Sequence, residues 1–239
     1  MAFQRTLPIF DEARLDQVVN VASVPQRSPF RYPGGKTWLI PRIRVWLASL
    51  TRRPRTLVEP FAGGAIVGLT VAAERMADHV VLVELDADVA AVWQTLIYGD
   101  AHTLADRILD FEPSVEKVEA LLSQPPRNTE ERAFQTILRN RVNHGGILAP
   151  GSGRIKHGEN GKGVWSRWYP RTLHKRILDI AKMRERITFV QGDGIEMLRQ
   201  WRDDSTAAFF IDPPYTAAGK FAGRRLYTHY ELNHEELFR

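Results

Sequence analysis

Residues 56–64 read Thr-Leu-Val-Glu-Pro-Phe-Ala-Gly-Gly, and this stretch decides the fold. The apolar run at 56–62 predicts a short strand, which the glycine pair Gly63-Gly64 ends. Residues 65–76 follow with apolar side chains at helical spacing, so a helix is expected directly after the glycines. A strand, a glycine turn and a helix in this order are typical of a parallel sheet.

The same alternation of strand and helix recurs along the chain. Residues 79–86 (HVVLVELD) predict a second strand, and residues 87–99 predict a second helix. Residues 186–194 predict a third strand that ends in a Gly-Asp-Gly turn. Residues 205–215 (STAAFFIDPPY) predict a fourth strand that two prolines stop. These elements predict an α/β fold, a doubly wound, Rossmann-like parallel sheet with helices on both faces.

About a hundred residues of different character separate the second and third predicted strands. They open with helical patterns and continue with a stretch that holds seven of the 17 glycines. The net charge of the chain is +5, yet the segment from Arg139 to Arg186 holds twelve basic residues against three acidic ones. A localised basic surface is typical of a polyanion partner, and a solvated basic face is the alternative.

The composition excludes several classes of protein. Hydrophobic residues make up 44%, which is enough for a folded core. No apolar run reaches the roughly 18 residues of a membrane span, and the N-terminus has no apolar segment of a secretory signal, so we expect no membrane partner and a cytoplasmic location. The chain has no cysteine, which excludes disulfides and thiolate chemistry. Its seven histidines show no metal-site spacing, so we expect no metal.

Ligands of open parallel sheets bind outside the carboxyl ends of the strands. Gly63 and Gly64 follow the first predicted strand, where absent side chains let a ligand approach the backbone. Glu84 ends the second strand, and a carboxylate there can accept hydrogen bonds from both ribose hydroxyls of a nucleoside. A tight turn for the glycines and a helix N-cap for nearby acids are the alternatives.

The sequence Asp212-Pro213-Pro214-Tyr215 gives the strongest functional signal. Two prolines fix successive φ angles and remove two N–H donors, so the segment presents a carboxylate, bare carbonyls and an aromatic ring on a rigid backbone. Hydrogen bonds from a base amine to the Asp212 carboxylate and the Pro213 carbonyl would return electron density to that nitrogen. Tyr215 could stack on the base and hold it for in-line attack on a methyl donor. An ordinary turn is the alternative.

In these motifs the chain resembles the Dam-like (D12 class) DNA adenine-N6 methyltransferases, which use S-adenosylmethionine. Residues 30–36 resemble the leading motif of that family, residues 60–64 its cofactor loop, Asp193 its adenine-contacting acid and residues 212–215 its catalytic motif. Glu84 stands where most relatives have Asp. The resemblance implies catalytic roles for Asp212, Pro213, Pro214 and Tyr215. It also implies cofactor contacts from Tyr32, Gly34, Lys36, Phe61, Gly63, Glu84, Asp193 and Asp212.

Residues 140–146 resemble the start of the target-recognition region of this class. We therefore expect an irregular lead-in at 1–27, a discontinuous cofactor-binding domain at 28–100 and 187–239, and a mostly helical, basic DNA-recognition domain at 101–186. The resemblance implies double-stranded DNA as the partner, and a restriction enzyme acting on the same site is a further candidate partner. Candidate contacts to DNA are Arg139, Arg141, Asn143, Arg154, Lys156, Lys162 and Arg167.

Two rival readings fail and three remain. A P-loop requires glycine where Phe30 stands, and cytosine-C5 methylation requires a cysteine. Cytosine-N4 methylation, RNA adenine methylation and a catalytically inactive DNA-binding relative stay open as alternatives.

The resemblance implies a seven-stranded sheet, but no apolar strand is evident after Tyr215. That stretch predicts a basic loop and then a helix near Asn233. We therefore expect the chain to lack the C-terminal closing strands, with the fourth strand at a sheet edge.

Overall fold

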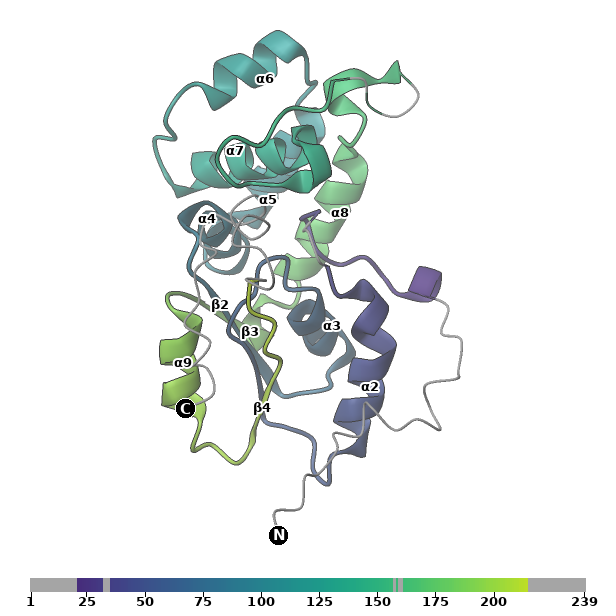
Figure 1. The fold of residues 1–239 in the computed structure, drawn as a ribbon, viewed down its shortest axis with the longest axis vertical. Helices are drawn as coiled ribbons and strands as arrows, with labels where there is room; N and C mark the ends of the chain where they lie inside the picture. The colour runs from purple at the N-terminus through teal and green to yellow at the C-terminus, as the bar shows by residue number, and fades with distance from the viewer. Residues whose placement is uncertain (1–20, 32–34, 157, 159–160, 215–239) are drawn as a thin grey trace.

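The computed structural model describes residues 21–31, 35–156, 158 and 161–214 (Figure 1). The strands in this part of the chain form one parallel sheet in the order β3-β2-β1-β4. A doubly wound dinucleotide-binding sheet begins with this same order, 3-2-1-4, so the predicted fold class is confirmed. The strands are β1 (Thr56–Glu59), β2 (His79–Glu84), β3 (Ile187–Gln191) and β4 (Ala207–Phe209).

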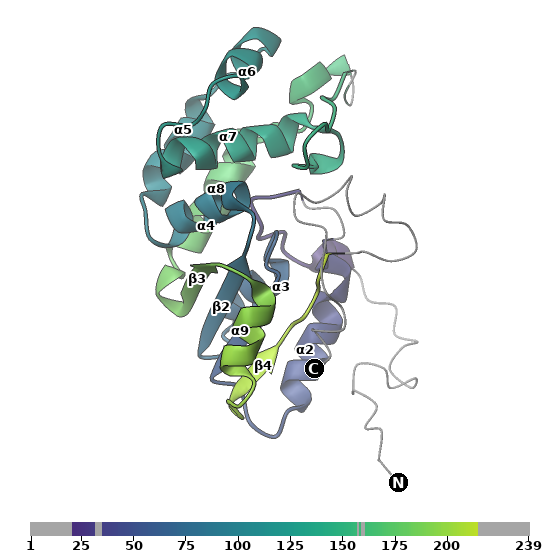
Figure 2. The same ribbon diagram turned by 60° about the vertical axis from the view of Figure 1, so that its left-hand side comes forward.

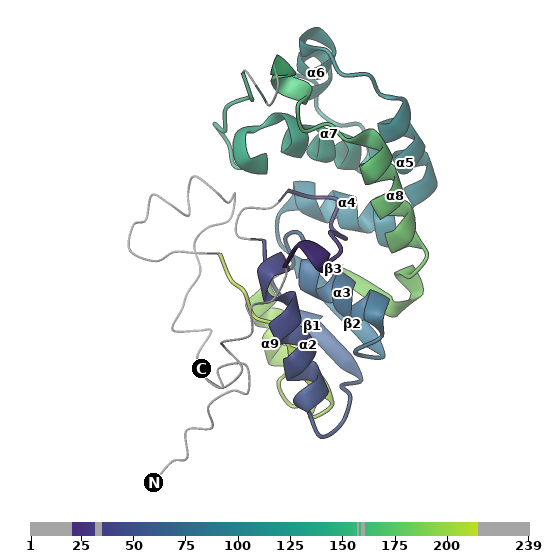
Figure 3. The same cartoon turned by 90° about the vertical axis from the view of Figure 1, so that its right-hand side faces the viewer.

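Helices cover both faces of the sheet (Figure 2). On one face lie α2 (Ile40–Ser49) and α3 (Ile66–Glu74), and α9 (Gly194–Trp201) lies on the other (Figure 3). Successive strand residues point to opposite faces. Leu57 of β1 joins the hydrophobic cluster under α3, whereas its neighbour Val58 packs in a second cluster with Met197 of α9. Burial on both faces explains why these strands are short apolar runs without alternation.

The strands are shorter than the sequence predicts. Strand β1 ends at Glu59, before Pro60, and β4 ends at Phe209. The Phe210 amide still donates to the carbonyl of Val58 at 2.9 Å, which leads the chain to Asp212 beside the end of β1. Pro213 and Pro214 thus lie just beyond the sheet. Proline has no backbone N–H, but at this position no strand hydrogen bond requires one.

Several helices connect β2 to β3, and most begin at a side-chain cap. Asp86, Asp100, Ser114 and Asn128 each accept a hydrogen bond from a backbone N–H of the helix that follows. The helices are α4 (Ala87–Ile97), α5 (Ala101–Asp110), α6 (Val115–Leu122), α7 (Thr129–Val142) and α8 (Pro170–Ala181).

The helices between β2 and β3 share one hydrophobic core with the sheet. Trp93 of α4, Phe134 of α7 and Leu173 of α8 are all fully buried in the same cluster as Leu57 of β1. Figures 1 and 3 show α7 lying across α4, and α8 running down toward β3. The insertion is therefore packed directly on the sheet domain. The hydrophobic core continues across residues 101 and 186, so the domain boundary at these positions is a proposal about function.

Some expectations concern residues that the structure does not describe. The predicted loop and helix after Tyr215 lie outside the described residues, as do residues 1–20 of the lead-in. Among the described residues, no helix combines the length and the apolar character that crossing a bilayer requires.

Candidate active site

A cavity of about 510 Å³ lies at the carboxyl ends of β1, β2 and β4. This is the volume range of small-molecule sites, and the position between β1 and β4 is the switch point where such sheets bind ligands. The cavity wall contains the loop after β1, the end of β2, the turn after β3 and the segment after β4. Residues of α7 and α8 complete it.

The loop after β1 presents backbone to the cavity. Gly63 has a φ of 46°, a conformation that side chains disfavour, and its carbonyl accepts a hydrogen bond from Nε1 of Trp93 at 3.0 Å. The Ala62 amide donates to the carbonyl of Val83 at 2.8 Å, which fixes the loop against β2. Phe61 and Gly64 line the cavity as well. The sequence-predicted glycine loop is thus built as a ligand-facing turn.

Glu84 lies at the end of β2 with both carboxylate oxygens held by backbone. The Gly63 amide donates to Oε2 at 2.9 Å, and the Asp86 amide donates to Oε1 at 2.9 Å. Burial raises the pKa of Glu84 to about 7, and the nearby charge of Asp86 raises it further against the effect of these hydrogen bonds. Each oxygen keeps lone-pair capacity for a donor from a ligand.

The neighbouring acids have structural roles. Asp86 caps α4, accepting hydrogen bonds from the amides of Asp88 and Val89 at 2.8 and 3.1 Å. Asp193 caps α9 through the Ile195 amide at 2.7 Å while also lining the cavity. Both acids are therefore helix N-caps; for Asp86 this is the alternative that the sequence left open.

The turn after β3 approaches the β1 loop closely. A Cβ built on Gly194 would overlap the carbonyl oxygen of Pro60 and lie 2.7 Å from Cε1 of Phe61. Only glycine at 194 allows this approach. A Cβ built on Gly192 in the same turn would lie 3.8 Å from its nearest neighbour atom, which is an ordinary contact distance. The Gly-Asp-Gly turn therefore closes one side of the cavity.

Asp212 meets Lys36 across the cavity. The ammonium nitrogen of Lys36 lies 2.6 Å from Oδ2 of Asp212, and the side chains are 12% and 26% exposed. Pro213 and Pro214 line the cavity beside them. The structure thus brings the leading motif and the Asp-Pro-Pro motif together, as the resemblance implies. Tyr32, Gly34 and Tyr215 lie outside the described residues.

Glu59 is a cavity residue that the sequence reasoning missed. It is only 3% exposed at the end of β1, and the Gly68 amide of α3 donates to its Oε2 at 2.7 Å. Burial raises the pKa of Glu59 to about 8, and the charge of Asp212 adds to this, whereas Lys36 acts in the opposite direction. As the one charged residue in the apolar run at 56–62, directly before Pro60, it was the signal available in the sequence.

The candidate DNA contacts divide into buried and exposed residues. Arg141 is 3% exposed, donates to the carbonyl of Pro29 and lines the cavity, and burial lowers its pKa to about 9. Asn143 is 1% exposed, and its Nδ2 donates hydrogen bonds to the carbonyl of Ile147 and the hydroxyl of Ser152. The structure therefore does not place these two side chains on the basic surface where the sequence located them, because both are buried in the protein.

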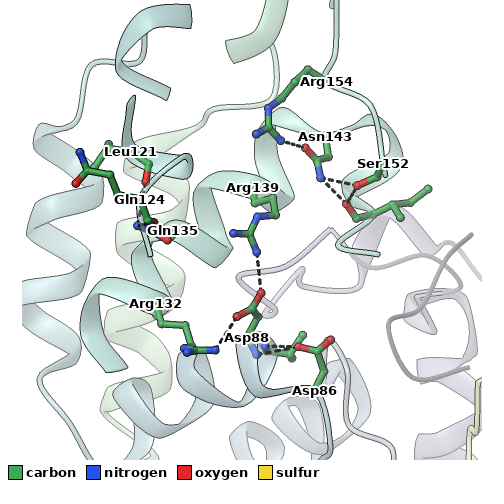
Figure 4. Close-up of polar contacts among 12 residues, drawn as sticks. Asp86, Asp88, Leu121, Gln124, Arg132, Gln135, Arg139, Asn143, Ser152 and Arg154 are labelled. Atoms are coloured by element: carbon green, nitrogen blue, oxygen red, sulfur yellow. Dashed lines mark hydrogen bonds and ion pairs between the residues drawn. The ribbon is translucent and has the colours of Figure 1, made fainter. Parts of the chain in front are cut away.

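The other candidates remain accessible to a partner. Arg139 pairs with Asp88 of α4 at 2.7 Å, and Arg154 donates to Asn143 at 2.5 Å beside a second, open hollow (Figure 4). Lys156 and Lys162 are exposed, and Arg167 is partly buried. Nothing in the described contacts brings these side chains into the main cavity.

These features define a class. A 3-2-1-4 parallel sheet with a glycine loop after β1, an acid ending β2 and Asp-Pro-Pro after β4 is the arrangement of a Rossmann-like methyltransferase. Residues 32–141 match the model of the D12 class N6 adenine-specific DNA methyltransferase family. The match covers a little under half of the chain; it confirms the resemblance to Dam-like enzymes and indicates a DNA adenine methyltransferase enzyme. No curated protein matches the chain significantly.

Proposed function

We propose that the enzyme transfers a methyl group from S-adenosylmethionine to N6 of adenine at specific sites in duplex DNA. One observation carries this proposal above the others. The carboxylates of Glu84 and Asp212, on the ends of two different strands, line the same cavity. One is suited to a ribose and the other to an amine, so the cavity can hold a nucleoside cofactor and a base at once.

The residues present fit S-adenosylmethionine. Glu84 keeps lone-pair capacity on both oxygens for the ribose hydroxyls, and the loop at Gly63, with its positive φ, presents backbone to the ligand. Asp193 lines the wall where the resemblance expects contact with the adenine ring. When bound, the cofactor supplies a methyl group on a positively charged sulfur.

Asp212 has the position of an acceptor for the base amine. The lone pair of an adenine amine is delocalised into the ring, and acceptors for its two N–H groups make the nitrogen a better nucleophile. Asp212 now shares its carboxylate with Lys36 at 2.6 Å, so the lysine holds this acceptor in place before a base enters. The carbonyl of Pro213 offers the second acceptor. The surplus proton leaves after transfer, when the nitrogen is cationic, so no general base is required.

The base must leave the duplex to reach Asp212. Stacked adenine is inaccessible inside DNA, and flipping it costs a few kcal/mol of unstacking. The exposed cations Lys156 and Lys162 of the insertion are suited to phosphate contacts that hold the duplex during this step. We place this activity in the cytoplasm, with a restriction enzyme of the same target site as a candidate partner.

Transfer of tritium from methyl-labelled S-adenosylmethionine to a long unmethylated duplex tests the proposal. We expect incorporation with the wild-type chain and its loss in Asp212→Ala, because the variant lacks the acceptor for the amine. Asp203→Ala is the matched control, since its side chain is 91% exposed at the end of β4 opposite the cavity. Near-wild-type rates in Asp212→Ala would remove this residue from the reaction.

A further inference from the structure

Asn140, near the end of α7, bonds to a segment that lies 109 positions earlier in the chain. Its side chain is completely buried. The Arg31 amide donates to Oδ1 at 2.8 Å, and Nδ2 donates to the carbonyl of Arg31 at 2.9 Å. Asn140 thus pairs with both backbone groups of one residue, as a neighbouring strand would. Arg31 is the second residue of the leading motif at 30–36, whose Lys36 lies in the cofactor site.

Residues 28–31, which lead into the cofactor site, are held mainly by side chains of the insertion. Arg176 of α8 donates to the carbonyl of Ser28 at 3.0 Å, and Arg141 of α7 donates to the carbonyl of Pro29. The ring of Phe30 packs on Trp93 of α4 with centroids 5.8 Å apart. Lys36, which reaches Asp212, lies five residues after Arg31. The position of this segment therefore depends on Arg141 and Arg176 of the predicted recognition region, with Trp93 of the predicted cofactor-binding domain packed beneath it.

The same amide also holds the start of the glycine-rich basic stretch. Nδ2 of Asn140 donates to the carbonyl of Gly146 at 2.6 Å. Gly146 has a φ of 75°, and a Cβ there would overlap the carbonyl oxygen of Arg31. Asn143 and Arg154 continue the contacts into the loop that follows (Figure 4). One buried side chain therefore joins the loop expected to meet DNA with the segment that leads into the cofactor site.

We propose that Asn140 is a positioning residue that couples DNA engagement to cofactor binding. Movement of the loop at Gly146 is transmitted to Arg31 because both carbonyls share the same donor group. The proposal rests on the function proposed above. Such coupling is reciprocal, so the factor by which DNA tightens cofactor binding equals the factor by which cofactor tightens DNA binding.

The test measures the Kd for S-adenosylhomocysteine, by calorimetry on the full chain, without and with a long unmethylated duplex. For the wild type we expect DNA to tighten binding by about 5- to 150-fold, the usual range of allosteric coupling. In Asn140→Ala this ratio should fall to about 1. Gln135→Ala is the matched control. Gln135 is a buried amide on the same helix that donates to the carbonyls of Leu121 and Gln124, away from the cofactor site (Figure 4).

Gly146→Ala provides a second variant in case Asn140→Ala fails to fold. It leaves Asn140 in place but forces the loop away from Arg31, so it should reduce the same ratio. The proposal is overturned if Asn140→Ala, or Gly146→Ala in its place, keeps the wild-type ratio. The proposal is also overturned if Gln135→Ala lowers the ratio of the two Kd values as much as Asn140→Ala does. A ratio near 1 in the wild type overturns it as well. Absence of S-adenosylhomocysteine binding by the wild type would instead refute the proposed function.

Discussion

The raised pKa of Glu84 predicts that cofactor affinity depends on pH near neutrality. Burial and the neighbouring charge of Asp86 bring the pKa of this carboxyl to about 7. The ionised form accepts hydrogen bonds on both oxygens, whereas protonation turns one of these oxygens into a donor and so weakens the pairing with two ribose hydroxyls. Because a carboxyl loses its charge as pH falls through its pKa, affinity should be highest above pH 7 and should decrease below it.

The size of the effect follows from the ionised fraction. With a pKa of about 7, Glu84 is about nine-tenths ionised at pH 8 and about one-tenth ionised at pH 6. The apparent Kd is the intrinsic Kd divided by the competent fraction. We therefore expect the Kd for S-adenosylhomocysteine to be about tenfold higher at pH 6 than at pH 8. Binding at pH 7 should also release protons, since the ligand favours the ionised form.

Isothermal calorimetry in two buffers of different ionisation enthalpy measures both quantities. Glu84→Gln should bind about 10- to 100-fold more weakly at pH 8, because a hydrogen bond to a charged group is worth about 1.5–3 kcal/mol. Its Kd should not change with pH. Glu196→Gln, an exposed acid in the first turn of α9, should behave as wild type. A flat wild-type profile, or the same slope in Glu84→Gln, would refute the reasoning.

Three further predictions address the rest of the site. Glu59 of the folded protein keeps its proton up to a pKa of about 8, so the free energy of unfolding should fall by about 1 kcal/mol from pH 7 to pH 8. Denaturant titration measures this decrease, which should be absent in Glu59→Gln. Gly194→Ala should weaken cofactor binding in calorimetry and lower the melting temperature, whereas Gly192→Ala should change neither. Equal effects of the two substitutions would contradict the close approach of Gly194 to the β1 loop. Lys156→Ala should reduce the slope of log DNA affinity against log salt by about 0.9, and Lys182→Ala, at the far end of α8, should not.

Much of the active site could be predicted because parallel strands bring their carboxyl ends to one edge. Gly63, Glu84 and Asp212 each follow a predicted strand, so one topological rule places all three at the cavity. Strand lengths were overestimated, since apolar residues continue past the last ladder bond at Glu59 and Phe209.

The insertion was less predictable because its contacts are long-range. Arg141 reads as one of many basic residues, yet it is buried against Pro29, which lies 112 positions earlier. Asn140 opens the stretch that resembles the recognition region, but its contact with Arg31 could not be predicted, since helical periodicity does not say which element a helix face meets. Local patterns therefore indicated several helices in the insertion, whereas their caps and the packing of α7 on residues 29–31 required the structure.

The most direct test of the central claim is nucleoside analysis of DNA exposed to the enzyme. DNA from methylase-deficient cells that express the wild-type chain is digested, and its nucleosides are measured by mass spectrometry. The account predicts N6-methyladenine above the level in cells that express Asp212→Ala, without N4-methylcytosine. N4-methylcytosine alone, or N6-methyladenine that persists unchanged in Asp212→Ala, would contradict it.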